Sequence, residues 1–435
     1  MKKLMVVLMG LLFSASAFAQ DAQGPQFKYS VWANAFAVTE TTAKKDEYKD
    51  YSNIRVRPMF TLTNENVSVV TRLEIDQYFG GNNNTKTFET DPGGDDVEVD
   101  FGKNGNSYAG KGTDNYAVEV KNIYIDVKDM FMPGLSMRAG LAGFRYPIMF
   151  NEDAAIFNFS FVAGMAKIDL TYGKVWEGST TEKKADGVDN KDDQQFYSAK
   201  AAIKAGDITI TPAMLYAVGE EDSAREYALM MPALSLGMKQ GTLSVNADFV
   251  YVTGDYDKAN KVDASAYAAF LNVGYKVSDA LLVNVFGLYT TGENDKADER
   301  TSFKTASTLD KVRVGTMFIM NDGGNITQVG ISNEFDEATE GIMMFGLSAS
   351  MKMDKLTVLG QIAYATTTSD KVVKDTAIGT ELNLRLAYEV APKTSVWAEG
   401  AYLAAGDYVK AVQTGASLGK NDNPMYYALG VMTSF

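Results

Sequence analysis

Two residue types are missing from this chain of 435 residues, which contains no histidine and no cysteine. Without histidine there can be no Ser-His-Asp catalysis, no histidine general base and few kinds of zinc site. Without cysteine there can be no disulfide, thiolate metal site, iron–sulfur cluster or haem attached through cysteine. We therefore expect that the protein is not an enzyme and carries no cofactor.

Long hydrophobic runs and positive charge are also scarce. After the N-terminal region, no apolar run is long enough for a membrane helix, which excludes α-helical membrane proteins. Proline occurs only 9 times, whereas glycine occurs 38 times and tyrosine and phenylalanine 23 times each. The formal net charge of −14 argues against a nucleic-acid partner.

The N-terminus has the three parts of a secretory signal peptide. Lys2 and Lys3 form a charged start, and residues 4–13 form an apolar stretch too short to span a bilayer. Ala17-Phe18-Ala19 provides small residues around a cleavage site. We expect residues 1–19 to be a signal peptide and residues 20–435 to form a single domain.

Most of the remaining sequence alternates between apolar and polar residues with a period of two. Residues 243–251 place Leu243, Val245 and Phe249 on one face, and Asn246 and Asp248 on the other. Successive side chains of a β-strand point to opposite faces, so this pattern predicts strands of about ten residues. Similar segments lie at 27–37, 52–62, 67–77 and 378–388.

The connections between these segments alternate between short turns and long polar loops. Short turns are expected near 64–66, 206–207 and 354–355, and long loops near 79–116 and 406–424. This rhythm predicts an all-β, antiparallel, up-and-down β-barrel. Counting segments gives about 18–20 strands, within a range of roughly 16–20. The upper value requires weak segments at 156–163 and 325–333 to be strands.

The last eleven residues, Met425 to Phe435, alternate in the same way and end on an aromatic side chain. This ending resembles the assembly signal of Gram-negative outer-membrane β-barrels, with candidate residues Tyr427, Leu429, Val431 and Phe435. The resemblance implies a transmembrane barrel in the outer membrane with both termini in the periplasm. It also implies contacts with outer-membrane lipid, lipopolysaccharide and the barrel assembly machinery.

Charged residues on the polar faces of the predicted strands would face a water-filled lumen. The candidate pore-lining residues are Arg55, Arg57, Arg72, Glu74, Asp76, Arg138, Asp248, Arg313, Glu381, Arg385 and Glu399. One interpretation is a ladder of arginines that guides anionic solutes, because the guanidinium group stays charged and donates several hydrogen bonds. The other is structural: the arginines pair with the carboxylates and stiffen the wall.

Residues 144–158 alternate less clearly than their neighbours and contain Pro147. They are a candidate constriction that folds into the lumen, with Arg145, Glu152 and Asp153 facing the pore. The alternative is an ordinary external loop. The acidic segments 91–100 and 186–193 do not match the spacing of a calcium-binding loop, so no metal site is predicted.

The resemblance implies an outer-membrane porin for passive diffusion of small hydrophilic solutes, and it is compatible with a homotrimer. A second hypothesis is a substrate-specific channel for an anionic or sugar solute, using the arginines together with Trp32 and Trp397. A third is a barrel without transport function, either an adhesin or a scaffold for partner proteins.

Overall fold

The computed structural model describes residues 24–41, 48–79, 116–176, 194–221, 225–294, 296–303, 316–320, 326, 340–371, 374, 376–414 and 423–435. The expected signal peptide and the candidate Arg313 lie outside these ranges.

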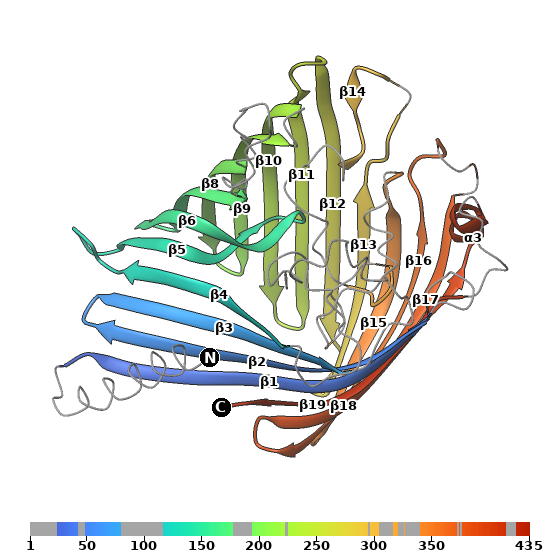
Figure 1. The fold of residues 1–435 in the computed structure, drawn as a ribbon, viewed down its shortest axis with the longest axis horizontal. Helices are drawn as coiled ribbons and strands as arrows, with labels where there is room; N and C mark the ends of the chain where they lie inside the picture. Colours follow the sequence, from blue (N-terminus) through green and yellow to red (C-terminus); the bar gives the residue numbers. More distant parts are fainter. Residues whose placement is uncertain are drawn as a thin grey trace, which may run out of the picture.

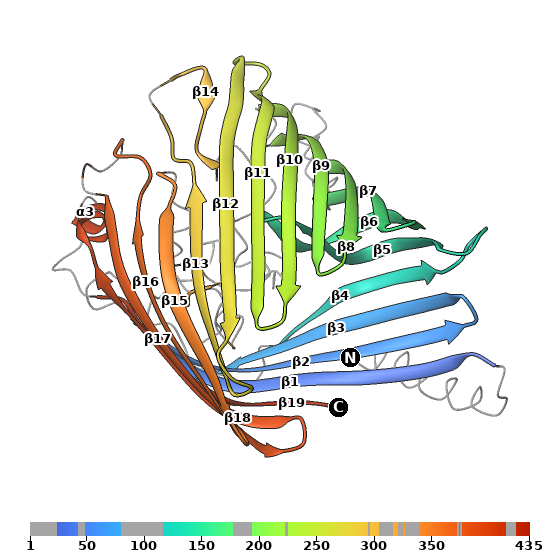
Figure 2. The same ribbon diagram turned by 180° about the vertical axis from the view of Figure 1, so that it is seen from behind.

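A closed antiparallel barrel of 18 strands makes up most of the described structure (Figures 1 and 2). The first nine strands in the chain are β1 (Gln26–Thr41), β2 (Tyr48–Asn64), β3 (Val67–Phe79), β4 (Tyr116–Val127), β5 (Leu135–Tyr146), β6 (Phe150–Ala163), β7 (Ala166–Trp176), β8 (Gln194–Ala205) and β9 (Ile208–Glu221). The others are β10 (Arg225–Gln240), β11 (Leu243–Asp257), β12 (Val262–Lys276), β13 (Leu281–Thr290), β15 (Met343–Met353), β16 (Leu356–Thr366), β17 (Ala377–Ala391), β18 (Thr394–Ala405) and β19 (Met425–Ser434).

Each barrel strand pairs with its neighbours in sequence, and β19 closes the ring by pairing with β1 from Trp32↔Ser434 to Thr41↔Met425. A short strand, β14 (Glu299–Arg300), pairs in parallel with β12 and lies outside the ring. The described residues also contain α3 (Asp407–Thr414), within the connection that was predicted as a loop at 406–424. No described helix has the length and apolar character needed to cross a membrane.

The prediction of an all-β barrel is confirmed. The weak segment 156–163 lies within β6. Of the other weak segment, 325–333, the structure describes only Ile326, which is not in a strand. Described residues close the ring with 18 strands, the lower of the two expected values.

The connections define two different ends of the barrel. At one end, here called the short-turn end, strands are joined by tight turns such as those at Gly164 and Gly206. Both glycines have a positive φ, 61° and 63°, which tight hairpin turns require and side chains disfavour. The opposite end, the long-loop end, carries α3 and β14.

Alternation along the strands gives the barrel a distinct outer and inner face. Outer-facing Leu271 and Leu384 are 47% and 53% exposed, while inner-facing Leu229 and Val250 are fully buried. Aromatic residues gather on the outer face toward the long-loop end, where the rings of Tyr267 and Tyr289 stack 5.5 Å apart. An apolar outer surface with an aromatic rim is typical of a barrel surrounded by lipid.

The terminal strand has the predicted alternation. Tyr427, Leu429 and Val431 of β19 are all exposed on the outer face, and Phe435 is 69% exposed. The backbone N–H of Phe435 donates to the Val31 carbonyl of β1 at 2.9 Å. The last residue is thus fastened across the seam between the first and last strands.

Candidate functional site

The inner wall of the barrel has two chemically different arcs. The first, here called the polar arc, covers β2 to β8 and carries most of the charged inner side chains near the cavity described below. The second, the apolar arc, covers the long-loop half of β9 to β16. Its buried inner residues include Leu215, Leu229, Met231, Val250, Val252, Ala266, Phe286, Leu288, Met344 and Ala363.

On the polar arc, several of the predicted lumen residues form ion pairs. The Arg55 guanidinium donates to both carboxylate oxygens of Asp76, at 2.7 and 2.9 Å, and lies 3.6 Å from Glu74. Arg57 donates to the same Glu74 and lies 5.1 Å above the ring of Trp32. These arginines sit on β2 opposite the carboxylates of β3. Their arrangement matches the structural interpretation, in which arginine and carboxylate pair across the wall.

Arg138 on β5 is also paired. Its guanidinium donates to both oxygens of Asp126 on β4, at 2.7 and 2.9 Å. It also lies 4.2 Å from the centre of the Tyr124 ring. A bidentate pair stacked on an aromatic ring holds the guanidinium in one position.

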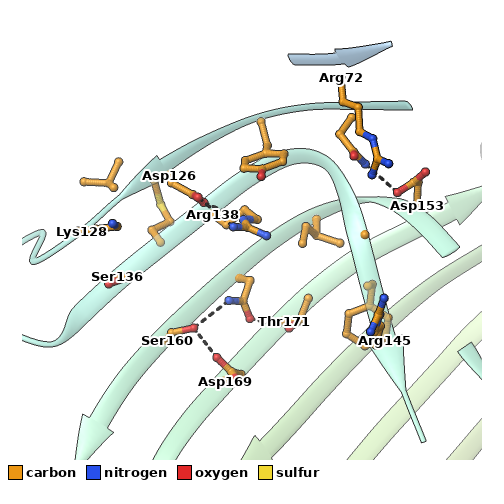
Figure 3. Close-up of a pocket in the computed structure, with 18 of the residues that line it drawn as sticks. Arg72, Asp126, Lys128, Ser136, Arg138, Arg145, Asp153, Ser160, Asp169 and Thr171 are labelled. Atoms are coloured by element: carbon orange, nitrogen blue, oxygen red, sulfur yellow. Dashed lines mark hydrogen bonds and ion pairs between the residues drawn. The ribbon is translucent and has the colours of Figure 1, made fainter. Parts of the chain in front are cut away.

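A cavity of about 900 Å³ opens between these pairs (Figure 3). The charged residues that line it are Arg57, Arg72, Lys121, Lys128, Arg138, Arg145, Lys167, Lys200, Asp126, Asp153 and Asp169. Eight cationic side chains therefore face three carboxylates. Hydroxyl and amide groups of Ser136, Asn158, Ser160 and Thr171 complete the polar lining. This composition suits a site for small anions.

Two of the four arginines that line the cavity differ from the other two. Within the described part of the chain, neither Arg72 nor Arg145 forms an ion pair with a carboxylate. Both border the cavity in Figure 3. Asp153 is engaged elsewhere, because it accepts a hydrogen bond from Asn122 at 2.7 Å and lies 3.5 Å from Lys121. The guanidinium groups of Arg72 and Arg145 are thus placed to contact a solute.

The tip of the β5–β6 hairpin packs against the inner face of the opposite wall (Figure 1). Tyr146 donates a hydrogen bond to the Met231 carbonyl of β10. The rings of Phe144 and Phe196 lie 4.5 Å apart, and Met149 at the turn is fully buried. This hairpin contains the segment predicted as a constriction.

The three constriction candidates occupy different positions on this hairpin. Asp153 lines the cavity, and the Arg145 carbonyl accepts a hydrogen bond from Lys200 at 3.0 Å. Glu152 pairs with Phe144 in the strand register, and its side chain lies outside the described part of the structure.

A second segment inside the barrel, residues 316–320, was not predicted from the sequence. Three consecutive backbone N–H groups, those of Phe318, Ile319 and Met320, donate to the carboxylate of Glu381 on the inner face of β17 at 2.7 to 2.9 Å. Glu381 is fully buried. The charge predicted to face a pore therefore anchors a chain segment, which connects β14 to β15.

Glu399 on β18 performs a similar role. It accepts hydrogen bonds from the backbone N–H of Ile326, from Arg385 and from Tyr426. Arg385 lies 4.9 Å from the centre of the Phe318 ring. Glu399 and Arg385 follow the alternation expected of a pore wall, and both contact the inserted segment, of which residues 316–320 and 326 are described. A clue is the run Met317-Phe318-Ile319-Met320, which is apolar without alternation and buried in the structure.

Asp248, the remaining described candidate, lies away from the cavity. It is on the inner face of β11 and accepts a hydrogen bond from Ser235 of β10. At the long-loop end, Tyr408 of α3 donates to a carboxylate oxygen of Glu340 at 2.8 Å. Burial, together with this carboxylate, raises the pKa of Tyr408.

Comparisons with known proteins identify the fold. No family model matches the chain, and no curated protein matches it in sequence. Among solved structures, OccAB4 of Acinetobacter baumannii is similar with a TM-score of 0.58 and 10% identity over 94% of this chain and 98% of the other. The outer membrane protein OpdK of Pseudomonas aeruginosa has a TM-score of 0.55 and 8% identity over 94% and 99%. OpdK was also solved with vanillate. At these identities the similarity establishes the shared fold.

Proposed function

We propose that this protein is an outer-membrane channel that passes small anionic solutes. The observation that carries the proposal is the cavity on the polar arc, where eight cationic side chains face three carboxylates. The barrel with an apolar outer face and aromatic rim supports the membrane location. The shared fold with an outer membrane protein of Pseudomonas aeruginosa supports it further.

The contacts of the two candidate tryptophans, Trp32 and Trp397, favour an anionic solute over a sugar. Trp397 donates its indole N–H to Asn34 at 3.1 Å and is 4% exposed. Trp32 lies beneath the Arg57 guanidinium. The buried Trp397 ring is therefore closed to a stacking sugar, and the Arg57 guanidinium covers one face of the Trp32 ring. Vanillate, the ligand solved with OpdK, is itself a small carboxylate.

The rest of the sequence hypothesis belongs to the same proposal. Residues 1–19 act as the signal peptide, and the barrel assembly machinery recognises the end of β19 together with Phe435. The short-turn end and both termini face the periplasm, while the long-loop end contacts lipopolysaccharide. The β5–β6 tip with Arg145 and Asp153 narrows the pore. A homotrimer is compatible with this arrangement.

The test is the reversal potential of single channels in a planar bilayer with a potassium chloride gradient. We expect an open conductance with a reversal potential of the sign given by anion preference. Replacing the two arginines that pair with no described carboxylate, R72Q/R145Q, should lower the anion-to-cation permeability ratio by at least about twofold, because two charges leave the cavity wall. Cation preference, or a folded barrel without conductance, would contradict the proposal.

The matched control is D126N/R138Q. It removes an ion pair from the same cavity and leaves the net charge of the lining unchanged. An arginine and the carboxylate it pairs with contribute little net field together. D126N/R138Q should therefore change the permeability ratio less than Arg72→Gln or Arg145→Gln does alone. An effect of D126N/R138Q equal to that of either single change would contradict a role for the net charge of Arg72 and Arg145.

A further inference from the structure

Lysines recur at one structural position around the short-turn end of the barrel. There, a backbone N–H within the last three residues of a strand, or directly after it, donates to a carbonyl of the preceding turn at the same end, and the structure gives seven such bonds of 2.8 to 3.2 Å. Five of the seven donors are lysines, namely Lys128, Lys204, Lys239, Lys276 and Lys352. The other two are Glu389 and Ser434. We call the five residues the lysine collar.

The strand period points the collar toward the pore. Lys276 has the parity of the buried Ala264, Ala266 and Ala268 of β12, which face inward. By the same parity Lys239 shares a face with Met231, and Lys352 shares one with Met344. Lysines on the outer face would contact lipid head groups, whereas Lys239, Lys276 and Lys352 face the opening of the barrel.

Three members of the collar share a cavity. Lys239, Lys276 and Lys352 line a space of about 520 Å³ at the short-turn mouth, together with Ser244, Ser278 and Ser350. Backbone hydrogen bonds fix the spacing of their strand ends, because Lys276 N–H donates to Thr242 and Lys352 N–H donates to Ala280, both at 2.8 Å. The hydroxyl groups can donate hydrogen bonds to an anion held among the three ammonium groups.

Carboxylates neutralise little of this charge. Asp279, also in the cavity lining, pairs with Lys276 at 2.6 Å and projects fully into solvent. This hydrogen bond lowers the pKa of Asp279. Among the described residues, the other four collar lysines form no ion pair. Their side chains are exposed.

We propose that the three collar lysines that share this cavity, Lys239, Lys276 and Lys352, form a second anion-binding station, apart from the polar-arc cavity that Lys128 lines, which takes small anions bearing carboxylate or phosphate groups at the short-turn mouth. The proposal rests on the anion channel proposed above. Ammonium groups are strongly hydrated point charges on flexible stems, so they hold an anion without the fixed geometry of a guanidinium. The collar therefore concentrates anions at the mouth and releases them readily.

The absence of natural cysteine permits a direct measurement of the local potential. In Lys276→Cys, the only thiol of the chain lies in the collar cavity. The thiol is treated with two methanethiosulfonate reagents of similar size, one bearing a sulfonate and one a trimethylammonium group. The ratio of the two reaction rates, divided by the ratio for a free thiol, reports the potential that an anion meets there.

We expect the sulfonate reagent to be favoured. Adding K239Q/K352Q to K276C should lower the normalised ratio by at least about threefold, because two charges leave the cavity. The matched control adds K355Q/K393Q, which removes two lysines from turns of the same end that do not line the cavity. The control pair should lower the normalised ratio by less than a third as much as K239Q/K352Q does.

Two outcomes would overturn the proposal: no preference for the sulfonate reagent, or equal effects of the collar and control pairs. The reagents reach the mouth directly from solution, so the result is independent of ion flow. A barrel with the predicted rate ratio but without anion conductance would retain the station and refute the channel. Anion conductance, with a rate ratio that K239Q/K352Q leaves unchanged, would retain the channel and refute the station. Heat-modifiable migration of each variant in gel electrophoresis shows whether it is folded.

Discussion

The polar and apolar arcs belong to one closed sheet, yet they use their inner faces differently. The polar arc carries charged side chains in pairs and leaves an open cavity of about 900 Å³ between them. The apolar arc is covered by chain that folds inward, such as the β5–β6 tip on Met231. Charged groups keep water in a lumen, whereas apolar groups gain stability by excluding it. In the proposed channel, the polar arc lines the conduction path and the apolar arc supports the tip of the β5–β6 hairpin.

The largest expected effect comes from the buried carboxylate that anchors the inserted segment. Glu381→Ala leaves three backbone N–H groups without their acceptor, and each unsatisfied buried group costs about 1–3 kcal/mol. We expect the free energy of unfolding in urea to fall by roughly 3 kcal/mol or more. The conductance should also rise as the segment around Phe318 leaves the wall.

Glu381→Gln is the control for this change. The amide keeps an acceptor oxygen and the shape of the side chain, so it should lose less stability than Glu381→Ala. If Glu381→Ala unfolds at the same urea concentration as the unchanged protein, the inserted segment is not held by this carboxylate.

The second prediction compares equivalent truncations in the two arcs. Leu229→Ala removes a fully buried side chain from the apolar arc and should cost about 3 kcal/mol through lost burial and a residual cavity. Lys167→Ala on the polar arc removes an exposed partner of Asp169, 3.4 Å away, and should cost less than about 1 kcal/mol. Urea unfolding of both variants checks the difference. Equal losses would mean that the two arcs do not differ in packing.

The third prediction concerns the contact between the tip of the β5–β6 hairpin and the apolar arc. Tyr146→Phe keeps the ring but removes the hydrogen bond to the Met231 carbonyl, which should cost about 1 kcal/mol. A looser hairpin tip should also increase the noise of the open channel current. Tyr124→Phe, whose ring lies under Arg138 in the polar arc, serves as the control. Identical current noise in both variants would argue against a role of the hairpin tip in shaping the pore.

Much of the wall could be predicted from sequence because alternation is a local property. A period of two within each strand is enough to place Arg55, Glu74 and Arg138 on its inner face. Their pairing could be offered only as one of two interpretations. The identity of each partner depends on strand register, which turn lengths and burial set together.

The inserted segment could not be predicted in this way. Glu381 alternates like any lumen residue of β17, and nothing within its strand indicates that three N–H groups from residues 318–320 will bind it. Such contacts join residues more than 60 positions apart, as in the bond from Phe318 to Glu381. The collar lysines were overlooked for a related reason. Only the backbone bonds of the structure show that they occupy equivalent positions.

The most direct test of the difference between the arcs is the accessibility of single cysteines from the pore. Ser160→Cys places a thiol in the cavity of the polar arc, and Val250→Cys places one in the apolar arc. We predict that a charged methanethiosulfonate reagent modifies Ser160→Cys rapidly and lowers the single-channel current, while Val250→Cys stays unmodified in the folded barrel. Equal modification of both positions, or faster modification of Val250→Cys, would contradict the account.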